Sequence, residues 1–145
     1  MKVKDVMTAD PACCSPDTNL KEVAQLMVKH DCGEIPVVKN KKPVGVITDR
    51  DIVVRTIAKG TNPLDLTAAD SMTKPCVTVT PETSIEECGK ILETNKIRRV
   101  PVIDTDGTCC GIVALADIAL RATPAVTSEV VKEVSEPGAA ASAAG

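Results

Sequence analysis

Residues 34–38 read Glu-Ile-Pro-Val-Val, and residues 99–103, 65 positions later, read Arg-Val-Pro-Val-Ile. Both stretches contain the β-branched residues typical of a strand, and each is followed, after a polar turn, by a second apolar run. Because the same strand pattern returns at a fixed distance, we infer an internal duplication.

The duplication extends on both sides of this stretch. Three further segments return at almost the same distance: residues 5–8 at 70–73, residues 15–20 at 80–85, and residues 45–52 at 111–118. The chain therefore consists of two copies of one unit.

We place the first repeat, with its linker, at residues 1–62 and the second at 63–123. Residues 124–145 are expected to form a short C-terminal helix and a disordered tail.

Each copy has the same predicted order of elements, β-α-β-β-α. Apolar residues at helical spacing, such as Leu20, Val23 and Met27, precede the paired strands. A leading strand is expected near residues 12–14 and 76–79, and a second helix at residues 49–59 and from about 115 to 121.

The composition is that of an ordinary globular chain. Its 145 residues are 43% hydrophobic, with a net charge of −3 and no Phe, Tyr or Trp. The lack of a net positive charge and of aromatic rings argues against nucleic-acid binding. No stretch reaches the roughly 18 apolar residues of a membrane span, and the start lacks the apolar core of a signal peptide. We therefore expect a cytoplasmic protein.

Seven cysteines and one histidine, His30, have no spacing typical of a metal site, so we expect no metal. The pairs Cys13-Cys14 and Cys109-Cys110 leave a redox or soft-metal role open, although neighbours in a strand point to opposite faces. The chain also lacks a nucleophile–base arrangement and a phosphate-binding loop. We therefore expect no enzyme and no required cofactor.

Residues 45–51, Gly-Val-Ile-Thr-Asp-Arg-Asp, allow two interpretations. Thr48 and Asp51 have the T-x-x-D spacing of a helix cap, in which hydroxyl and carboxylate satisfy free backbone N–H groups. The alternative is that they hold a ligand. In the second copy Ala114 replaces the threonine, while Asp117 is kept.

The motifs resemble a tandem pair of cystathionine-β-synthase (CBS) domains of the stand-alone bacterial type. The Met-Thr opening, the Pro-Val strand and the Gly-x-x-Thr-x-x-Asp ending follow one another twice over roughly residues 1–122. The resemblance implies an α/β (α+β) fold of two β-α-β-β-α units packed sheet to sheet with pseudo-twofold symmetry. It also implies two clefts for adenosine-containing ligands, a homodimer, and regulation without catalysis.

The resemblance also implies ligand roles. Thr48 would reach a phosphate or ribose, and Asp51 and Asp117 would hold ribose hydroxyls, which a carboxylate can accept in pairs. The second site lacks the threonine hydroxyl, so we expect it to be weaker by about 1 kcal/mol. Basic side chains are the phosphate candidates: Arg50, Arg99, Arg98 and Lys96. Apolar side chains of the paired strands would form the adenine-pocket walls: Ile35, Pro36, Val37, Val46, Val100, Pro101, Val102 and Ile112.

The leading hypothesis is a sensor of AMP, ADP or ATP that passes a change of dimer geometry to a protein partner, which the sequence does not identify. Two alternatives stay open. One is a ligand-independent dimeric interaction module, in which Asp51 and Asp117 only cap helices. The other is a module whose clefts bind NAD or S-adenosylmethionine.

Overall fold

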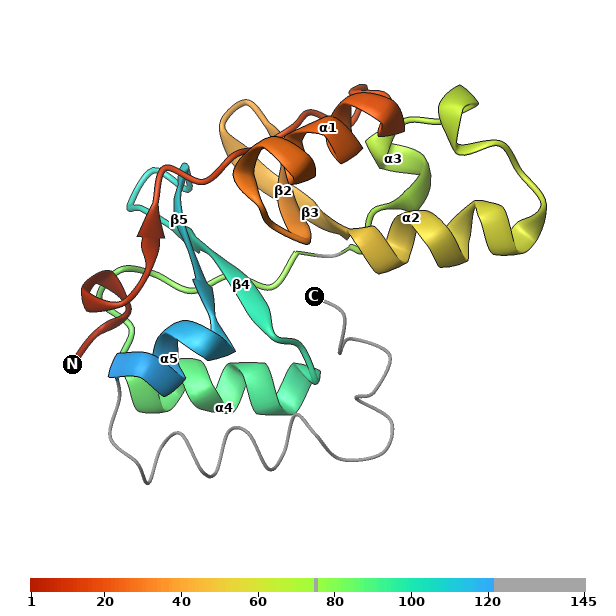
Figure 1. Ribbon diagram of the computed structural model, residues 1–145. Coiled ribbons are helices and arrows are strands. Elements are labelled where there is room, and N and C mark those ends of the chain that lie inside the picture. The colour runs from red at the N-terminus through yellow and green to blue at the C-terminus, as the bar shows by residue number, and fades with distance from the viewer. Residues whose placement is uncertain (75, 122–145) are drawn as a thin grey trace. The chain divides into compact units, whose positions relative to one another are not determined.

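The computed structural model describes residues 1–74 and 76–121 (Figure 1). The helix and tail expected over residues 124–145 lie outside the described residues. The described chain divides into two compact units. The first-repeat unit lies within residues 11–77, and the second-repeat unit combines residues 1–10 with residues 78–121.

The first-repeat unit contains a two-stranded antiparallel sheet with helices packed on it. Its elements in chain order are α1 (Leu20–His30), β2 (Glu34–Lys39), β3 (Lys42–Thr48), α2 (Asp49–Arg55), the 3-10 turns η2 (Ile57–Lys59) and η3 (Pro63–Asp65), and α3 (Ala68–Ser71). The core lies between α1 and one face of the sheet, where Ile35, Val37 and Ile47 are fully buried.

The second-repeat unit contains a three-stranded sheet with strand order β1-β5-β4. Its elements are η1 (Val3–Asp5), β1 (Thr8–Ala9), α4 (Ile85–Asn95), β4 (Arg99–Ile103), β5 (Cys109–Ala114) and α5 (Leu115–Arg121). Helices α4 and α5 lie side by side (Figure 1). Val100, Val102 and Val113 are fully buried. Two small sheets with helices confirm the predicted mixed fold.

The first helix of each unit begins at a side-chain cap, as the sequence predicts. Asn19 Oδ1 accepts the Glu22 N–H at 2.8 Å, and Ser84 Oγ accepts the Glu87 N–H at 3.1 Å. Both helices end at a residue in the left-handed conformation, Asp31 or Lys96. The duplicated sequence thus produces the same helix with the same boundaries.

The opening segments of the two repeats are exchanged between the units. Thr8 and Ala9 pair with β5 of the second repeat, while Thr73 forms a bridge with Val46 in β3 of the first. The repeat boundaries drawn on the sequence describe the duplication, whereas each compact unit contains the Met-Thr segment of the other repeat.

Three predicted elements are shorter than expected, namely the second helix of the first repeat and the leading strand of each repeat. Helix α2 ends at Arg55, because Thr56 departs from helical geometry and its hydroxyl donates to the Ile52 carbonyl. Each leading strand is reduced to a single parallel bridge, Cys14 with Val37 and Val79 with Val102. Prolines, which have no N–H for a strand ladder, bracket both segments in the sequence.

Candidate functional site

Each unit has a strand hairpin with two different faces. In the first-repeat unit Glu34 pairs with Thr48 and Pro36 with Val46. Because side chains alternate along a strand, these four residues lie on the face opposite the core. We call them the first hairpin face.

The second hairpin face occupies the same register in the second-repeat unit. Arg99 pairs with Ala114 and Pro101 with Ile112. The apolar pairs Pro36–Val46 and Pro101–Ile112 are therefore equivalent, whereas the polar ends of the two faces differ completely.

This alternation divides the predicted adenine-pocket walls into two groups. The structure places Pro36, Val46, Pro101 and Ile112 on the hairpin faces. It places the other four in the cores with no exposed surface: Ile35, Val37, Val100 and Val102. The two-residue period of the strands was the signal that separates these groups.

Thr48 and Asp51 form a complete capping box at the start of α2. Thr48 Oγ1 accepts the Asp51 N–H at 3.0 Å, and Asp51 Oδ2 accepts the Thr48 N–H at 3.0 Å. The other carboxylate oxygen of Asp51 lies 3.5 Å from Nε of Arg55. Because Thr48 serves here as an acceptor, its own O–H can still donate elsewhere.

Asp117 keeps half of this exchange at the start of α5. Its Oδ2 accepts the N–H of Ala114 at 2.8 Å, but alanine has no hydroxyl to accept the N–H of residue 117 in return. The two carboxylates are therefore held at equivalent strand-to-helix junctions, and each lies beside its hairpin face.

Arg98 and Arg99 stand at the same junction of the second-repeat unit. The N–H of Leu115 donates to the Arg98 carbonyl at 2.7 Å, and Arg99 pairs with Ala114. Nε of Arg98 and Nη1 of Arg99 are buried and have no hydrogen-bond partner among the described residues. A buried guanidinium N–H without an acceptor is costly, so these atoms are suited to an anionic group. Lys96 lies nearby in sequence, at the end of α4.

The equivalent junction of the first-repeat unit is acidic. The N–H of Asp49 donates to the Gly33 carbonyl at 3.1 Å, and the Asp49 carboxylate lies against Gly33. Glu34, in the position of Arg99, is only 8% exposed. Arg50 is exposed on the first turn of α2. Glu34 and Asp49 were not among the predicted site residues, although the 65-residue offset already aligned Glu34 with Arg99.

These differences can be compared in energy. A hydroxyl hydrogen bond such as the one that Ala114 cannot make contributes about 1 kcal/mol, while a bond to a charged group contributes about 1.5–3 kcal/mol. A hydrogen bond from the Arg99 guanidinium of the second hairpin face to a phosphate would therefore outweigh one from the threonine hydroxyl of the first.

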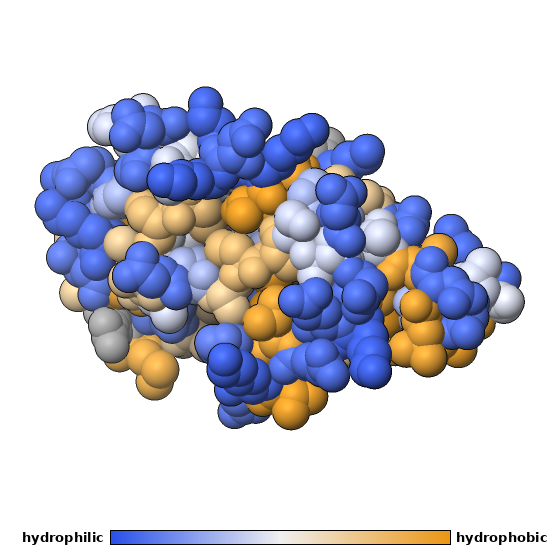
Figure 2. Space-filling view, turned by 90° about the horizontal axis from the view of Figure 1, so that it is seen from above, coloured by the Kyte–Doolittle hydropathy of each residue, from blue (hydrophilic) through white to orange (hydrophobic). Residues whose placement is uncertain are grey.

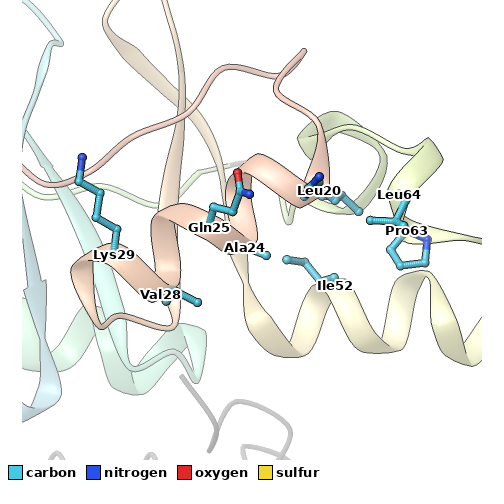
Figure 3. A pocket seen from close by; sticks show the side chains of 9 residues that line it. Leu20, Ala24, Gln25, Val28, Lys29, Ile52, Pro63 and Leu64 are labelled. Atoms are coloured by element: carbon cyan, nitrogen blue, oxygen red, sulfur yellow. The ribbon is translucent and has the colours of Figure 1, made fainter.

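A hydrophobic groove lies elsewhere in the first-repeat unit, between α1, α2 and η3. Its volume is about 460 Å³, and Figure 3 shows Ala24 of α1 and Ile52 of α2 pointing toward one another. Val28 and Leu64, which also line it, are 83% and 64% exposed. Hydrophobic groups also gather among hydrophilic ones over the connection from α2 to η3, at the right of Figure 2.

Burial changes the acidity of three cysteine thiols. Burial raises the pKa of Cys14 and Cys88 to about 11 and also raises the pKa of Cys110, which disfavours the reactive thiolate. Within residues 1–74 and 76–121, no three His, Cys, Asp or Glu side chains gather into a cluster that could hold a metal ion. Over the same ranges, no helix has the length and apolar character needed to cross a membrane.

Comparison with known proteins gives a consistent family. The CBS domain model matches residues 3–56 and 66–122. Hypoxic response protein 1 of Mycobacterium tuberculosis is 34% identical over 140 residues, which cover 96% of this chain and 97% of that protein. The crystal structure of Hypoxic Response Protein I with two coordinated zinc ions has a TM-score of 0.77 at 34% identity. The match covers 85% of this chain and 100% of that chain.

Two structures with bound adenosine compounds are also similar. CBSX2 of Arabidopsis thaliana in complex with AMP has a TM-score of 0.71 at 26% identity, over 83% of this chain and 95% of that chain. The CBS domain pair of MJ0100, in complex with 5-methylthioadenosine and S-adenosyl-L-methionine, has a TM-score of 0.74 at 26% identity, over 83% and 98% of the two chains.

Proposed function

Because the chain belongs to the CBS domain family and carries these domains as a tandem pair, we propose that this regulatory module is a cytoplasmic sensor of adenosine-containing nucleotides of the AMP, ADP and ATP class. The observation that carries the proposal is the arrangement found in both units. A carboxylate, Asp51 or Asp117, is held by a backbone N–H beside an apolar hairpin face.

The chemistry of a nucleotide fits this arrangement. A carboxylate can accept the two vicinal hydroxyls of a ribose, and charged hydrogen bonds of this kind contribute about 1.5–3 kcal/mol each. The adenine would lie on the apolar residues, Pro36 and Val46 or Pro101 and Ile112. Thr48 and the basic residues remain the candidates for phosphate: Arg50, Arg99, Arg98 and Lys96.

The similar structures support an adenosyl ligand. One of them contains AMP, and the other contains 5-methylthioadenosine and S-adenosyl-L-methionine. The adenosine moiety is common to all three compounds, so we propose it as the shared part of the ligand.

We further propose that the module acts as a homodimer and signals to a protein partner. The hydrophobic groove supports self-association, since exposed Val28 and Leu64 are costly to leave in water and a twofold contact would use the same patch on both copies. A ligand that binds one dimer geometry better shifts the population toward it, typically by 1–3 kcal/mol of coupling, on the order of tenfold.

Calorimetric titration with AMP, ADP, ATP, NAD and S-adenosylmethionine tests the proposal. We expect at least one adenine mononucleotide to bind the wild type. Removing the carboxylate of the occupied site, by Asp51→Ala or by Asp117→Ala, should weaken binding at least about tenfold. Asp51→Asn keeps an acceptor for the Thr48 N–H, so it separates loss of the ligand contact from loss of the cap. Asp17→Ala, at an exposed loop position, is the matched control.

Absence of heat from every compound would refute the sensor hypothesis and favour the ligand-independent interaction module. Binding of NAD or S-adenosylmethionine without binding of AMP, ADP or ATP would replace the proposed ligand class while keeping the site.

A further inference from the structure

The two hairpin faces share their apolar pairs but carry opposite charge at the strand start. Arg99 occupies this position in the second-repeat unit, and Glu34 occupies it in the first. These two residues stand in the same register relative to the strand-to-helix junction. A ligand on the first hairpin face would therefore meet Glu34, and a ligand in the same position on the second hairpin face would meet Arg99.

The positive charge of the second hairpin face is not neutralised within the described chain. Lys2 and Lys4 pair with Glu82, and Arg55 pairs with Asp51, but no ion pair of the described residues includes Arg98 or Arg99. Buried nitrogen atoms of both arginines also lack a hydrogen-bond acceptor among the described residues. A guanidinium with open N–H groups is suited to phosphate, because it can donate two parallel hydrogen bonds.

The first hairpin face has the opposite character. Glu34 is largely buried, and Asp49 follows the strand end directly, with its carboxylate against Gly33. Like charges repel most strongly where burial lowers the local dielectric constant. A phosphate next to Glu34 would be repelled by the carboxylate. The hydroxyl of Thr48 could offer that phosphate only one neutral hydrogen bond in compensation.

We propose that Arg99 and Glu34 make the two units unequal: the second-repeat unit binds the phosphate of a nucleotide, the first-repeat unit excludes phosphate, and each chain binds one phosphate-bearing ligand. This inference rests on the proposed adenosyl-binding function and specifies its stoichiometry and selectivity. It reverses the expectation that the second site is the weaker one.

Titrations with AMP and adenosine, which differ only by the phosphate, test the inference. We expect one AMP per chain in the wild type. Arg99→Gln should weaken AMP binding at least about tenfold, since it removes a charged hydrogen bond, while adenosine affinity changes less than about twofold. Glu34→Gln should allow a second AMP to bind. Lys90→Gln removes an exposed positive charge from α4 of the same unit and should leave AMP binding unchanged.

Arg99→Lys separates charge from geometry: it keeps the charge but loses the paired N–H groups, and we expect an affinity between those of wild type and Arg99→Gln. Circular dichroism establishes that each variant is folded, and Arg98→Gln replaces Arg99→Gln if the latter is not.

Two equivalent AMP sites in the wild type, or equal loss of AMP and adenosine affinity in Arg99→Gln, would overturn the inference while leaving the adenosyl-binding function in place. If neither AMP nor adenosine nor any other adenosyl compound binds, the proposed function itself fails.

Discussion

Met72 packs directly against Gly45, with its sulfur 2.9 Å from the point where a β-carbon of residue 45 would stand. The carbonyl oxygen of Thr73 is 2.8 Å from the same point, because Thr73 bridges to Val46. Gly111 has the same relationship to Met7, at 2.7 Å. The glycine that opens each Gly-x-x-Thr-x-x-Asp segment therefore makes room for the Met-Thr segment of the other repeat.

Gly45→Ala should lower the free energy of unfolding by about 1–3 kcal/mol, because the new methyl group meets a backbone oxygen that cannot move alone. Urea unfolding measures the change. Gly33→Ala is the matched control, since its methyl group would meet only the end of the exposed Asp49 side chain, at 3.2 Å. An equal loss in both variants would show that general glycine effects, and not this contact, determine stability.

The half-complete cap of α5 can be completed by substitution. Ala114→Thr supplies the hydroxyl that would accept the Asp117 N–H, and we expect a gain of about 0.5–1 kcal/mol in the free energy of unfolding. Thr48→Ala removes the equivalent bond from α2 and should cost about 1 kcal/mol. Thermal or urea unfolding measures both. If Ala114→Thr lowers stability, the second junction is not a latent capping box.

Ser71 is fully buried, and its hydroxyl has no hydrogen-bond partner among the described residues. The equivalent position of the first repeat is Val6. Ser71→Ala should raise the free energy of unfolding by about 1 kcal/mol, because it removes an unsatisfied polar group. Ser84→Ala is the control of opposite sign, since that hydroxyl caps α4, and its loss should destabilise the protein.

Stability should decrease at high pH because of two buried thiols. Burial raises the pKa of Cys14 and Cys88 from 9.0 to about 11. The folded state therefore holds these protons more tightly than the unfolded chain, so their contribution is complete below pH 9.0 and is lost as the pH rises to about 11.

Urea unfolding between pH 8 and about pH 11 measures this slope. A Cys14→Ala/Cys88→Ala double variant should unfold more easily at neutral pH but show a shallower decrease. An unchanged slope in the double variant would assign the pH dependence to other groups.

Val28→Asp and Leu64→Asp place a charge in the hydrophobic groove and should shift the proposed homodimer toward monomer, because burying an unpaired carboxylate is costly. Size-exclusion chromatography with light scattering measures the mass. Asn40→Asp adds the same charge in the β2–β3 turn, where both residue types tolerate the positive φ of 53°. Variants that remain dimeric would exclude the groove as the contact.

Local signals predicted the elements, and long-range packing explains the rest. The helices at Leu20 and Ile85 and the hairpins after them were predictable, because caps, helical spacing and β-branched runs act over a few residues. The sequence does not reveal that Met72 packs on Gly45, since that contact joins segments far apart in the chain. The early end of α2 depends on a hydrogen bond of Thr56, for which no sequence pattern was evident.

The candidate site was predictable in part for the same reason. Spacing identified Thr48, Asp51 and Asp117, and the structure holds the three at equivalent junctions. The sequence alone could not show which nitrogen atoms of Arg98 and Arg99 are buried without an acceptor among the described residues. Whether these residues bind a ligand stays a prediction.

The exchange of the Met-Thr segments makes each compact unit depend on both repeats. A fragment that ended at residue 62 would lack the segment that packs on Gly45, and a fragment that began at residue 63 would lack the segment that packs on Gly111. The boundaries at which the sequence repeats are therefore not boundaries at which the chain could be cut to give two complete units.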